Sequence, residues 1–242
     1  MYVNLRGVTV VLLPGTGSDD DYVQRALGGP CREAGATVVA PKPRPESLID
    51  GYRAALDSAA TVGRIAVGGV SIGAAVAAAW ALDNPLRTVA VLAALPAWTG
   101  EPGDAPAAAS AHYTASRLRS DGLAAVTAEM RSSSPPWLAD ELARSWRGQW
   151  PHLPHAMDEA AAFIAPSREQ FARLQAPMGV ACALDDPIHP WQVGREWARA
   201  APAAAAQDIS LAELGVDATV LGVACLTALG QAGVELGANA RV

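Results

Sequence analysis

The 242-residue sequence has no cluster of basic residues. Its 18 Lys and Arg residues are outnumbered by 24 Asp and Glu residues, and the net charge is −6 at pH 7. Proteins that bind nucleic acids or anionic membrane surfaces usually present concentrated positive charge. The charge pattern therefore argues against nucleic acids and membranes as partners.

Long apolar runs and a leader-like segment are missing too. No apolar run is long enough to span a bilayer, and the first predicted strand begins near residue 7 without a basic and then apolar segment before it. Cysteine is scarce, because Cys31, Cys182 and Cys225 are the only three, and they lie in apolar or helical surroundings. This odd number favours buried free thiols in a reducing compartment over disulfides. We therefore expect a cytoplasmic protein.

The overall balance of apolar and polar residues indicates a soluble globular protein. Apolar residues make up 51% of the chain, while the mean hydropathy is only +0.17. A chain of 242 residues can bury one substantial core, so we favour one domain with an inserted segment over two independent domains. The sequence carries no clear signal for an oligomeric state.

The most informative feature that is present is a serine between two glycines. A β-branched apolar run over residues 64–70 leads into the pattern Gly69-Val70-Ser71-Ile72-Gly73, and an alanine-rich helical pattern follows. A serine on a sharp strand-to-helix turn presents its hydroxyl above the sheet, and flanking glycines let neighbouring backbone come close. Ser71 is therefore the leading candidate for a nucleophile. The alternative is a turn that only packs a helix on a strand.

Two further apolar runs end in turns, one of which is rich in glycine while the other contains a pair of aspartates. Residues 7–17 form a buried-strand pattern that stops at Leu13-Pro14-Gly15-Thr16-Gly17, and residues 177–190 form another that ends in Asp185 and Asp186. With the serine turn between them, these features resemble the α/β-hydrolase family, in the same order and over nearly the whole chain.

The resemblance implies roles for particular residues. The backbone N–H groups of Thr16 and Ile72 correspond to the oxyanion hole, which holds the negative oxygen that forms when the serine attacks a carbonyl. Asp186 corresponds to the acid that orients a histidine, and Asp185 takes that place if the alignment shifts by one residue. As the alternative, either aspartate caps the helix expected near residue 190.

The family usually places its catalytic histidine after the last strand, but this sequence has no histidine beyond position 189. The four histidines are His112, His152, His155 and His189. His189 is a candidate base because its turn is expected at the same edge of the sheet as Ser71, and a structural role is the alternative. His112 would have to swing over Ser71 from another segment, and otherwise is a solvated helix residue. His152 and His155 are flanked by prolines and lack Cys or carboxylate partners at metal spacing, so we expect no metal site and no cofactor.

Strands that alternate with helices predict the α/β class, with a mainly parallel sheet flanked by helices. Further strands are expected at residues 36–40, 88–96 and 207–211, and helices at 46–61, 72–83, 190–200 and 217–230. Residues 18–21 predict a helix start in which the aspartates act as caps, with a ligand-facing role as the alternative. The alanine-rich residues 201–206 are interpreted as a helix end or linker.

Between residues 98 and 175 the strand patterns stop. Prolines cluster there, and helical segments are expected at residues 115–131, 137–147 and 155–164. This stretch resembles the helical cap or lid that many α/β-hydrolases insert, which implies a core of residues 1–97 and 176–242 and a cap of residues 98–175. Trp98, Trp137 and Trp146 are candidates to line an apolar substrate pocket, and the alternative is that they pack the cap on the core.

Together these features predict a serine hydrolase of the esterase type. Its substrate would be a carboxylic ester, thioester or related small acyl compound, cleaved through an acyl-Ser71 intermediate. One alternative is a non-hydrolytic protein of the same fold that binds a small apolar ligand or a partner, and another is lyase or acyl-transfer chemistry. The distance from the Ser71 hydroxyl to the His189 ring discriminates between catalysis and binding, because a binding protein needs no imidazole there.

Overall fold

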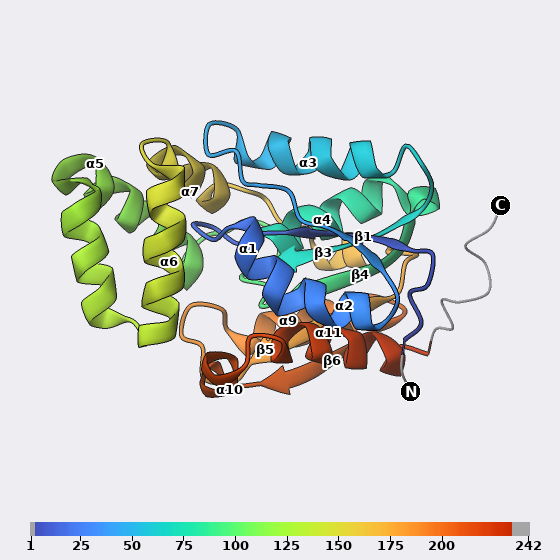
Figure 1. Ribbon diagram of the computed structural model, residues 1–242. Coiled ribbons are helices and arrows are strands. Elements are labelled where there is room, and N and C mark those ends of the chain that lie inside the picture. The colour runs from blue at the N-terminus through green and yellow to red at the C-terminus, as the bar shows by residue number, and fades with distance from the viewer. Residues whose placement is uncertain (1–2, 234–242) are drawn as a thin grey trace.

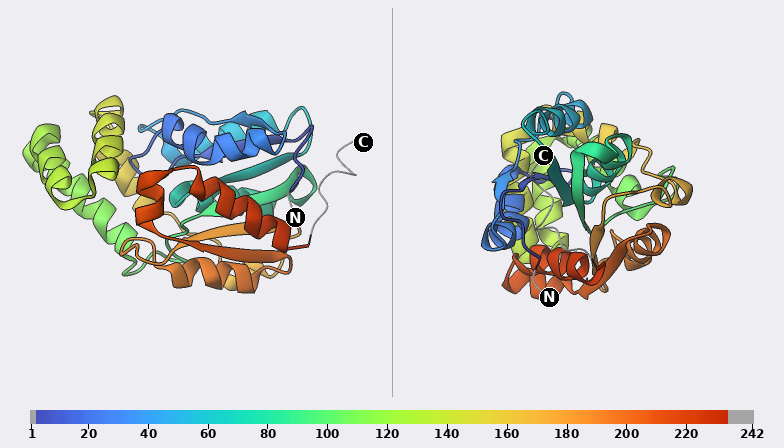
Figure 2. Two further views of the ribbon diagram at one scale, coloured as in Figure 1. Left: turned by 60° about the horizontal axis from the view of Figure 1, so that its bottom comes forward. Right: turned by 90° about the vertical axis from the view of Figure 1, so that its right-hand side faces the viewer.

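The computed structural model describes residues 3–233, which form a parallel sheet between helical layers (Figures 1 and 2). Six strands follow the order β2-β1-β3-β4-β5-β6, and every neighbouring pair is parallel. The strands are β1 (Thr9–Leu13), β2 (Thr37–Val39), β3 (Ile65–Val70), β4 (Thr88–Ala94), β5 (Met178–Ala183) and β6 (Ala204–Ile209). The predicted class and the parallel sheet are confirmed.

Helices connect the strands and close the chain. They are α1 (Asp20–Val23), α2 (Gly29–Glu33), α3 (Leu48–Ala59), α4 (Ile72–Asp83), α5 (Pro106–Ser133), α6 (Pro136–Gln149), α7 (Leu153–Ala161), α8 (Arg168–Phe171), α9 (Trp191–Ala200), α10 (Leu211–Val216) and α11 (Val220–Gln231). A π-helical turn, η1 (Gln24–Gly28), joins α1 to α2, and a 3₁₀ turn, η2 (Pro85–Arg87), precedes β4. Among residues 3–233 no helix combines the length and the apolar character that crossing a membrane requires.

The sheet is buried on both faces, as parallel sheets usually are. Side chains alternate along β1, so that Val11 and Leu13 belong to one apolar core, while Val10 and Leu12 belong to another. The first core includes residues of α3, α4 and α9, and the second includes residues of α2 and α11. This double burial explains why the strands read as continuous apolar runs rather than as alternating patterns.

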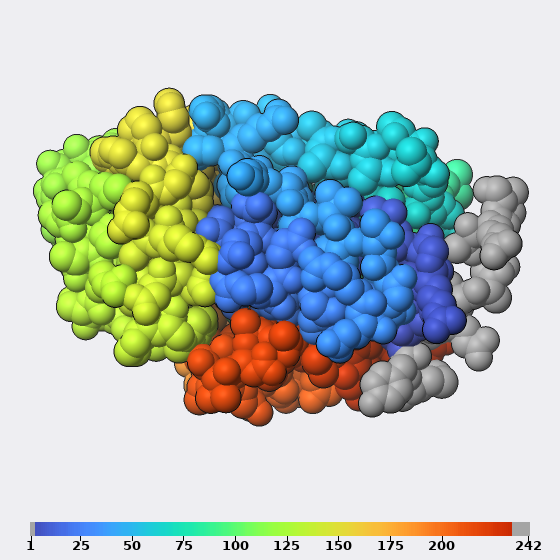
Figure 3. Space-filling view, in the orientation of Figure 1, coloured from blue at the N-terminus to red at the C-terminus, as the bar shows by residue number. Residues whose placement is uncertain are grey.

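The chain between β4 and β5, residues 95–177 and here called the β4–β5 segment, contains α5 to α8. Helices α5, α6 and α7 gather at one end of the molecule (Figure 1), and the space-filling view shows α5 and α6 as a block beside the core (Figure 3). Helices α5, α6 and α7 share a small apolar cluster, which includes Leu118, Trp146 and Met157.

The structure corrects several expected boundaries. The expected helix at residues 115–131 is part of a longer α5 that is broken at Gly122, where φ is 79° and only glycine fits without strain. Helix α7 begins at Leu153, two residues early, because Pro154 lies in its first turn, where a proline removes no helical hydrogen bond. The helix after residue 18 is short and continues as η1, although Asp19 caps it as predicted by accepting the Tyr22 N–H at 3.0 Å.

The interpretation of residues 201–206 as a helix end or linker holds for residues 201–203, where Ala201 is the C-cap of α9, and is wrong for residues 204–206. Strand β6 begins at Ala204, and residues 204–206 pair with residues 178–180 of β5. Alanine has a weak preference for strands, so the pairing with β5 decides the conformation. A short helix, α10, also follows β6 where none was expected.

The three cysteines are free and buried, as predicted. Burial raises the pKa of Cys31 to about 12 and that of Cys182 to about 11, and it raises the pKa of Cys225 as well. Thiols with such pKa values carry almost no thiolate at neutral pH. They are therefore structural rather than reactive groups.

Candidate active site

Ser71 lies in the turn between β3 and α4, in a backbone conformation that residues with side chains rarely adopt. Its φ is 54° and its ψ is −115°, and among the described residues Leu95 is the only other non-glycine with positive φ. The Ser71 N–H donates to the Ala94 carbonyl at 2.9 Å, which holds the turn against the end of β4. Strain of this kind persists only where the surroundings enforce it, and it concentrates at functional sites.

The flanking glycines are required by close backbone contacts. A Cβ atom on Gly69 would lie 2.4 Å from the Leu13 carbonyl oxygen, and one on Gly73 would lie 2.2 Å from the same oxygen and 2.6 Å from that of Pro14. The end of β1 therefore passes directly against the serine turn. Gly69 and Gly73 thus allow the close approach of neighbouring backbone that was predicted from the sequence pattern.

Gly73→Ala is expected to destabilise the fold by about 3 kcal/mol, since the added methyl group meets backbone that cannot move independently. Urea unfolding would measure the change. Gly148→Ala in α6 is the matched control, because a Cβ there meets nothing within 4 Å, and we expect that variant to be slightly more stable. Equal stability of the two variants would contradict this account.

His189 and Asp186 complete a chain of hydrogen bonds that starts at Ser71. The Ser71 Oγ atom lies 3.0 Å from His189 Nε2, and His189 Nδ1 lies 2.8 Å from Asp186 Oδ2. All three groups are largely buried, with side-chain exposures of 18% for His189 and 7% for Asp186 and a residue exposure of 8% for Ser71. Such an arrangement can take a proton from a serine hydroxyl and stabilise the resulting imidazolium.

Asp186 also shapes the turn that carries His189. Its Oδ1 atom accepts the backbone N–H groups of Ile188 at 2.8 Å and His189 at 3.1 Å. Burial opposes ionisation of this carboxyl, but the hydrogen bond and charge of the His189 ring, together with the two backbone N–H groups, hold its pKa below the usual range. The group is therefore a carboxylate at neutral pH.

Asp185 faces elsewhere. Its Oδ1 atom accepts the Leu211 N–H at 2.7 Å, at the start of α10. The structure therefore brings Asp186, and not its neighbour, to His189. Neither aspartate caps α9, which begins at Trp191 after Pro190 without a side-chain cap.

The backbone proposed for an oxyanion hole borders the same serine. Gly15 lies so close that a Cβ on it would be 3.7 Å from Ser71 Cβ, and Thr16 lines the cavity beside it. Ile72 is the first residue of α4, where helical geometry leaves the N–H without an intrahelical acceptor. Both N–H groups belong to turns that converge on Ser71.

A cavity of about 640 Å³ opens from the serine toward the β4–β5 segment. Its lining includes Ser71, Asp186 and His189, and also Trp98, Trp137 and Trp146, the three tryptophans singled out from the sequence. Each tryptophan packs as well: the Trp98 indole donates to the Phe163 carbonyl at 3.1 Å, and Trp137 lies against Gly215 of α10. The pocket and packing interpretations are therefore compatible.

The other histidines lie outside this arrangement. His112 is exposed and pairs with Asp158 at 3.0 Å, and His152 and His155 are exposed near the start of α7. Within residues 3–233 no three His, Cys, Asp or Glu side chains gather as a metal-binding group.

Two positioning residues were missed by the sequence analysis. Tyr52 of α3 is fully buried and donates its hydroxyl to the Pro14 carbonyl at 3.1 Å, which fixes the turn before Thr16. Leu95, the other strained residue, lines the cavity after β4. No local motif marks either residue, because each acts through contacts made far away along the chain.

The β4–β5 segment is tied to the core by polar contacts on two sides. The Glu159 carboxylate of α7 accepts the backbone N–H groups of Leu48 at 2.7 Å and Ile49 at 3.2 Å, at the start of α3. On the other side, Gln149 of α6 donates to the Ser18 carbonyl at 2.8 Å. These contacts join α6 and α7, which both contribute residues to the cavity wall, to the core.

Comparison with known proteins rests on structure. No protein-family model matches the chain, and no curated protein matches it in sequence. The fold is similar to that of MenH from S. aureus, with a TM-score of 0.71 and 14% identity over 97% of this chain and 98% of that one. It is also similar to a putative non-heme bromoperoxidase, BpoC, from Mycobacterium tuberculosis H37Rv, with a TM-score of 0.70 and 17% identity over 97% and 98% of the two chains. The enol-lactonase from Burkholderia xenovorans LB400 gives a TM-score of 0.62 and 17% identity over 84% of each chain.

Proposed function

We propose that this chain, which has the α/β-hydrolase fold, is a serine hydrolase that cleaves a carboxylic ester, thioester or related small acyl compound. The observation that carries the proposal is the unbroken chain of hydrogen bonds from Ser71 through His189 to Asp186, at the wall of a cavity. A protein that only binds a ligand needs no imidazole at the serine and no carboxylate behind that imidazole.

In the proposed reaction, Ser71 Oγ attacks the substrate carbonyl carbon while His189 Nε2 takes the hydroxyl proton. The negative oxygen that forms accepts hydrogen bonds from the N–H groups of Thr16 and Ile72. Asp186 keeps the proton on His189 Nδ1, so that Nε2 is free to accept. His189 then protonates the departing alcohol or thiol, which leaves an acyl group on Ser71.

Water completes the cycle. His189 takes a proton from a water molecule as the water oxygen attacks the acyl carbon, and the proton then returns to Ser71 Oγ as the carboxylic acid departs.

We assign residues 98–175 the role of a cap that limits access of other molecules to the site. In this role Trp98, Trp137 and Trp146 contact the substrate. The cytoplasmic location stays a prediction.

Labelling with a fluorophosphonate probe tests the proposal. We expect intact-mass analysis to show one phosphonyl group on the wild-type protein and none on Ser71→Ala, because only an activated serine reacts quickly. Ser58→Ala is the matched control, since Ser58 is exposed on α3, and it should label like the wild type. If the folded wild type resists even a small probe such as diisopropyl fluorophosphate, then the proposed mechanism is wrong.

A further inference from the structure

The charged side chains that line the cavity are mostly negative. Among residues 3–233 they are Glu129 of α5, Glu141 of α6, Asp186 and His189. In the proposed mechanism Asp186 and His189 are hydrogen-bonded to each other, so the negative charge of the carboxylate is directed at the imidazole. The two glutamates therefore set the electrostatic character of the remaining wall.

The arginines nearest to these glutamates are already engaged by carboxylates. Arg25 lies 2.8 Å from Glu141 and 2.9 Å from Asp21, while Arg144 lies 2.7 Å from Glu141 and 2.9 Å from Asp19 and also pairs with Asp21. In this cluster two arginines face three carboxylates. No positive charge is left over for a substrate.

Glu129 has a similar environment. Arg117 lies 3.1 Å from Glu129 and 2.6 Å from Asp121, so that one arginine serves two carboxylates. The same arginine also donates to the Tyr113 hydroxyl at 2.7 Å. The cluster that contains Glu129 therefore has two carboxylates for one arginine, and of these charged groups only Glu129 lines the cavity.

Tyr22 also lines the cavity, and its pKa is affected by the negative charge of Glu141. Burial, and after it the negative charge of Glu141, raises the pKa of Tyr22 to about 12, although Arg25 acts in the opposite direction. An added anion in the same space would meet the same repulsion.

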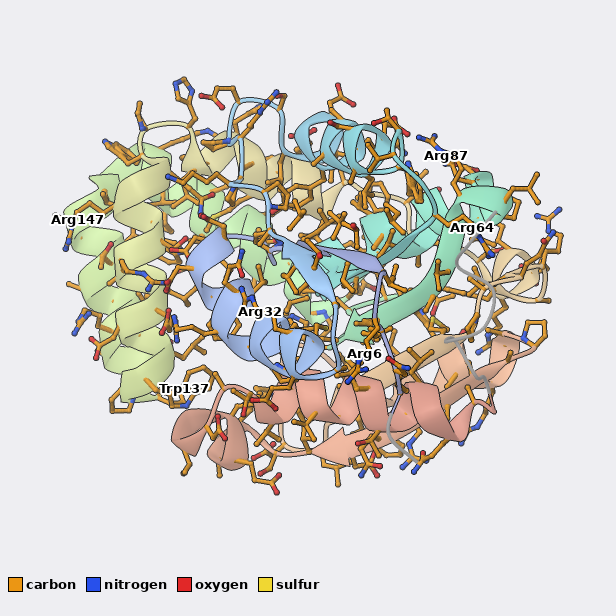
Figure 4. The ribbon with its side chains drawn as sticks, turned by 45° about the vertical axis from the view of Figure 1, so that its right-hand side comes forward. Arg6, Arg32, Arg64, Arg87, Trp137 and Arg147 are labelled. Carbon is orange, nitrogen blue, oxygen red and sulfur yellow. The ribbon has the colours of Figure 1, made fainter. Side chains whose placement is uncertain are left out.

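Other arginines lie away from the cavity. Arg6, Arg64 and Arg87 precede β1, β3 and β4, at the amino edge of the sheet, whereas Ser71 follows the carboxyl end of β3. The stick view shows these three away from α5 and α6, and it shows Arg147 at the outer edge of the block that these two helices form (Figure 4). These side chains do not line the cavity.

The rest of the wall is largely apolar. Leu95, Trp98, Val126, Met130, Leu138 and Leu142 are among its members. The volume of about 640 Å³ lies within the range that accepts a ligand of drug size. Apolar walls favour methylene groups, while an unpaired carboxylate would lose its water without gaining a partner.

We propose that the cavity selects an uncharged, apolar acyl group, such as an unbranched alkanoyl chain, and rejects an acyl group that ends in a carboxylate. This inference rests on the proposed hydrolase function and adds the substrate class. It is carried by the glutamates, by the paired arginines around them and by the apolar wall.

Hydrolysis of p-nitrophenyl esters by the full chain tests the selection. For straight alkanoyl esters of two to six carbons, kcat/KM is expected to rise roughly fourfold for each methylene that the cavity buries, which corresponds to about 0.8 kcal/mol. The hexanoyl ester is expected to exceed the mono-adipoyl ester, which carries a terminal carboxylate, by at least about 100-fold. The methyl ester of the adipoyl substrate is similar in size but uncharged, and it should recover most of the loss.

A charge-reversal variant assigns the selection to the cavity. Glu129→Lys is expected to reduce the hexanoyl-to-adipoyl ratio by about tenfold, because it places a cation in the wall. Glu101→Lys changes the net charge equally, and Glu101 is exposed like Glu129 but does not line the cavity, so the ratio should stay at the wild-type value.

The outcomes separate the two proposals. If the probe labels Ser71 but the adipoyl ester reacts within about threefold of the hexanoyl ester, the substrate class is wrong and the hydrolase proposal stands. An equal change of the ratio in Glu129→Lys and Glu101→Lys would overturn the assignment to the cavity. If no probe reacts and no ester is cleaved by the folded protein, both proposals fail.

Discussion

Ser71→Ala and His189→Ala are each expected to lower kcat/KM for an acyl ester by about 10⁴- to 10⁶-fold, and the double variant is expected to lose no more than either single variant. The reason is that the two residues act as one unit. Without His189, the Ser71 hydroxyl at 3.0 Å from the ring has no acceptor for its proton. Without Ser71, the imidazole has no hydroxyl to activate.

Steady-state hydrolysis of p-nitrophenyl butyrate would measure this effect, with thermal unfolding as the check that each variant is folded. His155→Ala is the matched control, because His155 is exposed in the first turn of α7, and its activity should equal that of the wild type. Losses that multiply in the double variant would show that the two residues work independently and would contradict the proposed unit.

Asp186→Asn is expected to lower kcat by about 10³- to 10⁴-fold. An amide at this position can donate to His189 Nδ1, which favours the tautomer with the proton on Nε2, so that Nε2 no longer accepts from the serine. Asp185→Asn is the matched control because its carboxylate faces the Leu211 N–H instead. We expect it to retain activity within about tenfold, and a larger loss than in Asp186→Asn would reverse the assignment of the acid.

The pH dependence of the wild type follows from the same contacts. Because the pKa of Asp186 is held below its ordinary value of about 4, the carboxylate stays ionised from about pH 4 upward. Its pairing therefore stabilises the fold above that pH, and this contribution is lost as the pH falls through the folded-state pKa. If activity falls as the pH is lowered but is still above about 4, protonation of Asp186 therefore cannot be the cause.

The position of the histidine is the unusual property of the proposed site. Asp186 and His189 lie in one turn after β5, and Asp186 Oδ1 holds that turn through the N–H groups of Ile188 and His189. One carboxylate thus shapes the loop and orients the imidazole. After β6, where the resemblance led us to look for a histidine, Ser210 and Glu213 instead form a capping box for α10.

Most of the core could be predicted from the sequence. The runs that became β1, β3, β4 and β5 are strongly apolar because both faces of a parallel sheet are buried. Helix α4 was expected at residues 72–83 and spans Ile72–Asp83, since alanine favours helices and the strand before it ends at a glycine-flanked turn. Strand β6 was only partly anticipated, because pairing with β5 rather than local preference determines its first residues.

The sequence by itself determined the α/β class, the serine turn with its two glycines, and the aspartate pair followed by a histidine, because these features depend on residues close together in the chain. Only the tertiary structure decided that His189 reaches Ser71, that Asp186 rather than Asp185 contacts the ring, and that two glutamates face the cavity. The physical reason is distance along the chain. Ser71 and His189 are 118 residues apart, and their 3.0 Å contact exists only because parallel strands bring separate turns to one edge of the sheet.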